Sequence, residues 1–156
     1  MKRRECLKMA GALVALGLPL LARAAQGPLV QVYKNEGCGC CEGWIAHLEK
    51  NGFRVKWENV ADTSVYRRKL GIPQELGSCH TAVVEGYALE GHVPAAEVLR
   101  LMKERPKAVG LAVPGMPVGS PGMEGDRQDK YDVLLVLADG RKKVFRKYVG
   151  ASPARL

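Results

Sequence analysis

Leu29-Val-Gln-Val-Tyr33, followed closely by Cys38-Gly-Cys-Cys41, places a cysteine-rich loop directly after a short β-rich run. A helix is predicted next, from about Cys41 to Lys50, because its apolar residues recur with the spacing of one buried helix face. These residues are Cys41, Trp44, Ile45 and Leu48. Asn51-Gly52 then ends the helix. The sequence therefore predicts a strand, a cysteine loop and a helix in immediate succession.

Apolar and polar residues continue to alternate beyond this unit. Phe53, Val55 and Trp57 alternate with charged residues, which predicts a half-buried strand. The next elements are predicted as a short helix capped by Asp62, strands near 81–85 and 88–90, and a helix from Pro94 to Pro106. The buried stripe of that helix is predicted as Ala95, Val98, Leu99 and Met102. The element order and the place of the cysteine loop predict an α/β, thioredoxin-like domain over residues 25–106.

The remaining residues, 107–156, have a different composition. The stretch from Val113 to Met123 is rich in glycine and proline and lacks periodicity, which predicts an extended loop over 107–130. Two β-rich runs joined by Asp139-Gly140 then predict a β-hairpin. We expect this Gly/Pro/Met-rich loop and hairpin to form a C-terminal extension that packs on the same domain.

The first residues have the composition of an export signal. A basic start, an apolar run from Ala10 to Leu21 that is too short to span a bilayer, and small residues up to Ala24 predict a signal peptide over 1–24. The pair Arg3-Arg4 leaves both a twin-arginine and a Sec route open. We expect a periplasmic protein, cleaved near Ala24, without stable membrane insertion after cleavage.

Half of the formal charge belongs to this signal. The whole chain carries +8, and loss of the five basic residues and one acidic residue within 1–24 leaves +4. A domain this mildly basic argues against nucleic-acid binding. The remaining residues suffice for one compact core, and no exposed amphipathic helix favours an oligomer, so we expect a monomer.

The four cysteines beyond the signal carry the chemistry. They are Cys38, Cys40, Cys41 and Cys79. Three of them are too close in sequence to make good structural disulfides. Cys38 and Cys41 have the C-x-x-C spacing of a thiol–disulfide oxidoreductase, at a helix N-terminus that favours thiolates. Cys40 favours a metal site, because a third thiol invites mispairing in dithiol chemistry but can serve as one more sulfur ligand.

Softer donors elsewhere in the chain favour copper. In a thioredoxin-like fold the loop before the third strand packs against the cysteine loop, so Cys79 and His80 are predicted to face it. Met116 and Met123 lie on an irregular loop with little core to fill. Sulfur ligands with imidazole favour copper, whereas zinc has no need of methionine.

Three other residues are assigned by their positions. His92 lies just before a predicted helix and is left open between a metal ligand and a structural role. His47 lies on the flank of the first helix, which favours a surface or packing role. Met102 lies on an apolar helix stripe, which predicts a core position.

Several motifs together resemble the CopG-type copper resistance proteins, a family with a CxCC signature. They are Gly37-Cys-Gly-Cys-Cys-Glu-Gly-Trp44, His47-Leu48, Gly52-Phe53, Cys79-His-Thr-Ala-Val-Val84, Glu90-Gly-His-Val-Pro94 and Pro114-Gly-Met-Pro-Val-Gly-Ser-Pro-Gly-Met-Glu124. The resemblance runs from about Val30 to Val149. It implies a thioredoxin-like domain whose C-terminal extension helps to bind metal, and several copper ions bridged by cysteine sulfur. It also implies a role in interconverting Cu(I) and Cu(II) in the periplasm.

The resemblance further implies a set of ligands. The sulfur ligands would be Cys38, Cys40, Cys41 and Cys79, and further matches to the family's motifs are His80, His92, Met116 and Met123.

Three functions are open on the sequence alone. The first is a periplasmic copper resistance protein, in which Cys38, Cys40 and Cys41 carry a redox-active site that interconverts Cu(I) and Cu(II). The second is a copper carrier that hands ions to an efflux system. The third is a metal-free thiol–disulfide oxidoreductase that uses Cys38 and Cys41. The sequence favours copper over dithiol chemistry and does not separate the oxidoreductase from the carrier.

Overall fold

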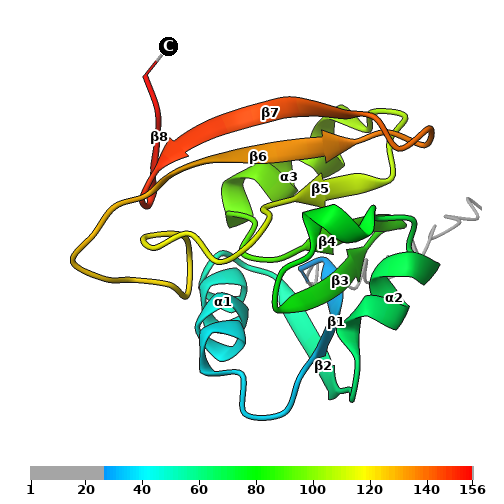
Figure 1. Cartoon of the computed structure of the whole chain (residues 1–156), viewed down its shortest axis with the longest axis horizontal. Helices are drawn as coiled ribbons and strands as arrows, with labels where there is room; N and C mark the ends of the chain where they lie inside the picture. Colours follow the sequence, from blue (N-terminus) through cyan, green and yellow to red (C-terminus); the bar gives the residue numbers. More distant parts are fainter. Residues whose placement is uncertain (1–26, 156) are drawn as a thin grey trace, which may run out of the picture.

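The computed structural model describes residues 27–155, which build one continuous mixed sheet with helices on both of its faces (Figure 1). The strands are β1 (Leu29–Lys34), β2 (Arg54–Asn59), β3 (His80–Val84), β4 (Tyr87–Glu90), β5 (Gly110–Ala112), β6 (Lys130–Val136), β7 (Lys142–Val149) and β8 (Ser152–Pro153). The helices are α1 (Gly39–Lys50), α2 (Thr63–Lys69) and α3 (Ala95–Glu104), with a 3-10 turn at Gln74–Leu76. The signal peptide predicted for residues 1–24 lies outside the described residues.

The sheet has the strand order β2-β1-β3-β4-β5-β6-β7-β8. The pairs β1–β2 and β4–β5 are parallel, and the other neighbours are antiparallel. The order of elements predicted up to α3 is confirmed. Strands β5–β8 continue the same sheet beyond β4, so the residues after 106 share the core of the residues before them.

The main core lies between the sheet and two helices. It joins Trp44, Ile45 and Leu48 of α1 and Ala95, Val98 and Leu101 of α3 to buried strand residues such as Val32, Val84 and Leu89. A smaller cluster on Ile72 and Leu76, just after α2, covers Ala88, Ala112 and Val136. The predicted buried face of α1 is confirmed.

Two predicted burial patterns are wrong at one position each. Trp57 is 55% exposed, because β2 is the edge strand of the sheet and has a neighbour on one side only. Leu99 is exposed while Leu101 is buried, so the buried stripe of α3 is rotated from the one predicted. Met102 packs against the core, as predicted, and is partly buried.

The loop predicted over 107–130 contains a strand that the sequence pattern missed. Strand β5 pairs with β4 on one side and with β6 on the other. A Cβ atom at Gly110 would lie 1.8 Å from the carbonyl oxygen of Ala88, so only glycine allows this close pairing. β5 is therefore the strand that joins the C-terminal hairpin to the sheet.

Within residues 27–155, no helix is long and apolar enough to cross a membrane.

His47 has a packing role, as predicted, and links two helices. The backbone N–H of Ala95, in the first turn of α3, donates a hydrogen bond to Nε2 of His47 at 3.0 Å. The residue before α3 is Pro94, whose side chain cannot cap the helix. The imidazole of α1 thus satisfies an N–H group that the helix start leaves unpaired.

We predict that His47→Ala lowers the free energy of unfolding by about 1 kcal/mol, because α3 loses this acceptor. His47→Gln is the matched control, since its side-chain carbonyl can accept the same bond and should restore much of the loss. Urea unfolding at pH 7.5 measures both. Equal losses in the two variants would show that the hydrogen bond contributes nothing.

Candidate metal centre

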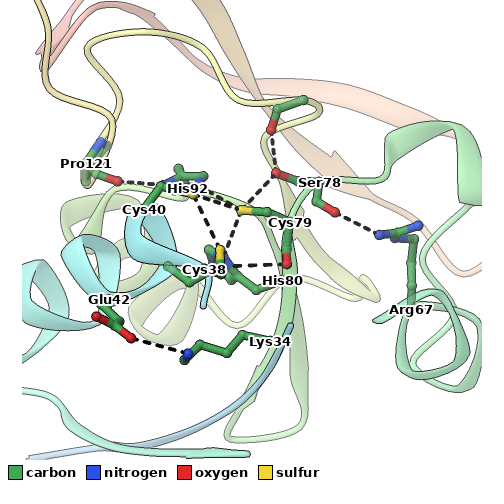
Figure 2. Close-up of a disulfide and its surroundings, with 12 residues drawn as sticks. Lys34, Cys38, Cys40, Glu42, Arg67, Ser78, Cys79, His80, His92 and Pro121 are labelled. Atoms are coloured by element: carbon green, nitrogen blue, oxygen red, sulfur yellow. Dashed lines mark hydrogen bonds and ion pairs between the residues drawn. A yellow bond between two sulfur atoms is a disulfide. The ribbon is translucent and has the colours of Figure 1, made fainter. Parts of the chain in front are cut away.

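The two cysteine segments meet because β1 and β3 are antiparallel neighbours. Lys34, at the end of β1, pairs with His80, at the start of β3. The chain leaves β1 into the cysteine loop and enters β3 directly from Cys79, so this pairing sets the two segments side by side (Figure 2). The sequence prediction that Cys79 and His80 face the cysteine loop is thereby explained by the register of the sheet.

The four sulfur atoms form one compact group. Cys38 is the residue before α1, and Cys40 and Cys41 lie in its first turn. Cys40 Sγ is 3.5 Å from Cys38 Sγ and 3.8 Å from Cys79 Sγ. The sulfur atoms of all four cysteines lie within 4.8 Å of one another. Such a group can hold a soft metal ion or exchange disulfides.

Cys38 and Cys41 are joined by a disulfide in the structure. Cys40 and Cys79 are free thiols and are partly buried. All four sulfurs can serve as metal ligands only after the disulfide is reduced to two thiols, because thiolates are the ligand form of cysteine.

Cys79 also belongs to a second group, with two histidines. Its Sγ atom lies 3.3 Å from Nδ1 of His80 and 3.0 Å from Nε2 of His92. Both imidazoles are fully buried, and the His80 ring lies 4.3 Å from the ring of Trp44, centre to centre. A ligand atom from each of the three residues lies within 4.8 Å of the others.

The hydrogen bond on the far side of His92 fixes which nitrogen faces Cys79. Nδ1 of His92 lies 2.8 Å from the carbonyl oxygen of Pro121. A carbonyl only accepts hydrogen bonds, so Nδ1 carries the hydrogen and Nε2 presents its lone pair to Cys79. This arrangement is usual for histidines that bind metals. No sequence pattern predicts the role of Pro121, because a backbone carbonyl has no residue-type signature.

Burial holds these groups in their neutral forms. Burial raises the pKa of the Cys79 thiol to about 12, and the neighbouring Cys40 thiol adds to the rise. Burial, together with His92, lowers the pKa of His80 to about 3. The pKa of His92 is lowered for the same main reason. Neutral imidazole is the form that binds metal, whereas the Cys79 thiol must release its proton to do so.

The donors fit a soft, thiophilic metal ion. Nε2 of His80 is buried and has no hydrogen-bond partner among the described residues, which is costly for a polar atom unless something binds there. Sulfur donors suit Cu(I), and imidazole suits Cu(II) as well. The two groups share Cys79, so one ion in each would be neighbours.

The loop that carries Met116 and Met123 is fastened over α1. A Cβ atom at Gly122 would lie 2.6 Å from the carbonyl oxygen of Cys40, which leaves no room for a side chain there. At the other end of the loop, Ser78 Oγ donates to the carbonyl of Gly115. Met116 is 53% exposed and Met123 is partly buried. Their roles as ligands remain predictions.

A sulfur–nitrogen donor cluster at the N-terminal end of a helix, held on a mixed α/β sheet, defines a candidate metal-binding protein. A family profile described as "Protein of unknown function, DUF411" matches residues 76–123. A comparison with curated proteins found no match.

Two solved structures, both named copper resistance protein CopG, are similar over most of the chain. The structure named form 2 is 51% identical, with a TM-score of 0.75, and the match covers 78% of this chain and 98% of that one. Form 1 is 52% identical, with a TM-score of 0.73, and the match covers 77% and 96%. The chain belongs to the CopG family of copper resistance proteins.

We predict that the metal-free protein loses stability as the pH falls from 7.5 to 5. The unfolded chain takes up a proton at His80 near pH 6.5, whereas the folded chain does not until about pH 3. At pH 5 this difference costs about 2 kcal/mol. Urea unfolding at several pH values measures the loss, and NMR should show His80 resonances that do not titrate between pH 8 and 5. A stability independent of pH would contradict this.

We predict that Gly43→Ala dislodges the loop over α1. The added Cβ atom would lie 2.9 Å from Cα of Gly122, so backbone must move, at about 1–3 kcal/mol. Hydrogen exchange should accelerate over 114–125. Gly39→Ala is the matched control on the same helix, because nothing lies within 4 Å of its Cβ position. If both variants exchange like the wild type, the Gly43–Gly122 contact does not hold the loop.

Proposed function

We propose that the chain is an exported, periplasmic copper-binding protein of copper resistance, with a redox-active site that holds several copper ions. The observation that carries this proposal is that Cys79 completes two donor groups at once. One has four sulfurs, from Cys38, Cys40, Cys41 and Cys79, and the other joins Cys79 to His80 and His92. The name of the similar structures, copper resistance protein CopG, supports the choice of copper.

The residues divide the work by their chemistry. Thiolates would hold Cu(I), and the imidazoles of His80 and His92 would make Cu(II) accessible at the same place. Bound copper supplies a one-electron couple, Cu(I)/Cu(II), which thiols and imidazoles alone lack. The carbonyl of Pro121 keeps His92 turned toward Cys79. The loop that carries Met116 and Met123 would close over the site, and their thioether sulfurs would be further soft ligands.

The strand order supports a thioredoxin-like domain as the base of the site. The strand order β2-β1-β3-β4 is the one expected for that fold, and α1 and α3 pack in the main core. The cysteine loop follows β1, which is also its expected place. Residues 107–156 would be an extension of the same domain that adds to the metal site. Export to the periplasm rests on the composition of residues 1–24.

One observation favours a second function, thiol–disulfide exchange. Cys38 and Cys41 form a disulfide at the start of a helix, as the C-x-x-C spacing allows. Against clean dithiol chemistry, the free thiol of Cys40 lies 3.5 Å from Cys38 Sγ, within reach of a competing exchange.

We predict that the reduced wild-type protein retains several copper ions per chain and gains thiolate-to-copper charge-transfer bands on mild oxidation. Cys40→Ser should lose at least half of the copper and most of the band intensity, because it removes a sulfur from the four-sulfur group. His47→Gln is the control, since His47 bonds the start of α3 and not a cysteine. Metal analysis and visible absorption measure both.

The alternatives give different results when cycling of the copper oxidation state and a disulfide reductase assay are added to this experiment. A copper carrier would retain copper, yet the ion would be lost when its oxidation state is cycled. A metal-free oxidoreductase would retain no copper, and its disulfide reductase activity would survive Cys40→Ser. Either result would exclude the redox-active copper site.

A further inference from the structure

A buried ion pair lies beside the donor cluster and is not part of it. Glu90, the last residue of β4, is fully buried, and Arg67 of α2 is 8% exposed. Nε of Arg67 donates to Oε1 of Glu90 at 2.9 Å. Buried pairs of this kind contribute little net stability, because removing both charges from water offsets their attraction. The arrangement around the pair indicates what it does instead.

Both partners bond the backbone of Ser78, the residue before Cys79. The N–H of Ser78 donates to Oε1 of Glu90 at 2.7 Å. The carbonyl of Ser78 accepts from Nη2 of Arg67 at 3.0 Å (Figure 2). Ser78 precedes the start of β3, so the sheet does not pair these groups. The ion pair thus bonds two partly buried backbone groups that the sheet leaves without partners.

The other carboxylate oxygen of Glu90 bonds Thr81, the residue that follows His80. Oε2 accepts from the hydroxyl of Thr81 at 2.6 Å. One carboxylate therefore holds Ser78 and Thr81, which lie on either side of Cys79 and His80. In addition, the N–H of Gly91, next to Glu90, donates to the carbonyl of His80 at 3.0 Å. Bonds from Glu90 and Gly91 thus hold the chain on both sides of Cys79 and His80.

We propose that Glu90 and Arg67 are positioning residues that set Cys79 against the cysteine loop and against the histidines. They touch no sulfur and act through Ser78 and Thr81. This inference rests on the proposed copper function for its consequence, since Cys79 is the donor that the two groups share. Its geometric content, a fixed Cys79 thiol, holds with or without metal.

The test replaces the ion pair without leaving a buried charge behind. The double variant Glu90→Met with Arg67→Met removes both charges and keeps similar volume, so neither charge is left buried without its partner. Arg67→Lys keeps the positive charge, but a single ammonium cannot reproduce the two-sided bonding of the guanidinium. Glu97→Gln is the control, because Glu97 is also a buried carboxylate but bonds Tyr148 instead of the Ser78 segment.

The first readout needs no metal. Alkylation of Cys79 by iodoacetamide is followed in the metal-free full-length chain, with the modified residue identified by peptide mass spectrometry. We expect the rate at Cys79 to rise about tenfold in the double variant and by a smaller factor in Arg67→Lys, because bonds to charged groups no longer hold the segment. Glu97→Gln should stay within about twofold of the wild type at Cys79, whatever it does to overall stability.

The second readout is the copper-loaded protein. The double variant should shift the thiolate-to-copper absorption and weaken Cu(I) binding by at least about tenfold, while Glu97→Gln leaves both unchanged. Wild-type Cys79 reactivity and an unchanged spectrum in the double variant would overturn the positioning role. If the wild type retains no copper but the variants still expose Cys79, the copper function fails and the positioning role stands.

Discussion

The antiparallel pairing of β1 with β3 is the constraint on which the site depends. Because Lys34 lies opposite His80, the C-terminal end of β1 lies beside the N-terminal end of β3. The cysteine loop and Cys79, distant in sequence, lie at these two ends. A shift of this register by one residue would turn His80 to the other face of the sheet and separate it from Trp44. The cysteine loop, Cys79 and His80 are thus brought together by the main-chain pairing of the sheet.

The buried donors of the site are neutral, and the charged groups lie outside it. The imidazoles and the Cys79 thiol lie in surroundings that penalise charge, so without metal they stay uncharged. The charged pair Arg67–Glu90 lies beside these groups, and its two partners bond each other and the backbone of Ser78. The ion pair that bonds Ser78 is therefore separate from the donors Cys79, His80 and His92. A ligand can bind these donors without breaking the ion pair.

The sequence predicts those parts of the fold whose pattern is local. The helix after the cysteines follows from the spacing of Trp44 and Leu48, and the neighbourhood of Cys79 follows from the order of elements. Strand β5 is short, includes Gly110 and lies in a stretch rich in proline, so no periodicity marks it. The exposure of Trp57 depends on which strand forms the edge, a property of the whole sheet.

The contacts that complete the site are harder to predict, because they join backbone atoms to distant side chains. The carbonyl of Pro121 accepts a hydrogen bond from His92, and the carbonyl of Ser78 accepts one from Arg67. Both acceptors are backbone atoms, so the residue types at positions 121 and 78 do not reveal these bonds. Likewise, the spacing of Cys38 and Cys41 permits a disulfide but does not require one.

The Cys38–Cys41 disulfide affects only one of the two donor groups. Oxidation of Cys38 and Cys41 removes two of the four sulfurs from the first group. The second group, on Cys79, His80 and His92, keeps all its donors in the same state. The cluster therefore contains a part that oxidation of Cys38 and Cys41 changes and a part that this disulfide leaves intact. Because Cys79 belongs to both parts, whatever fixes its position fixes the relation between them.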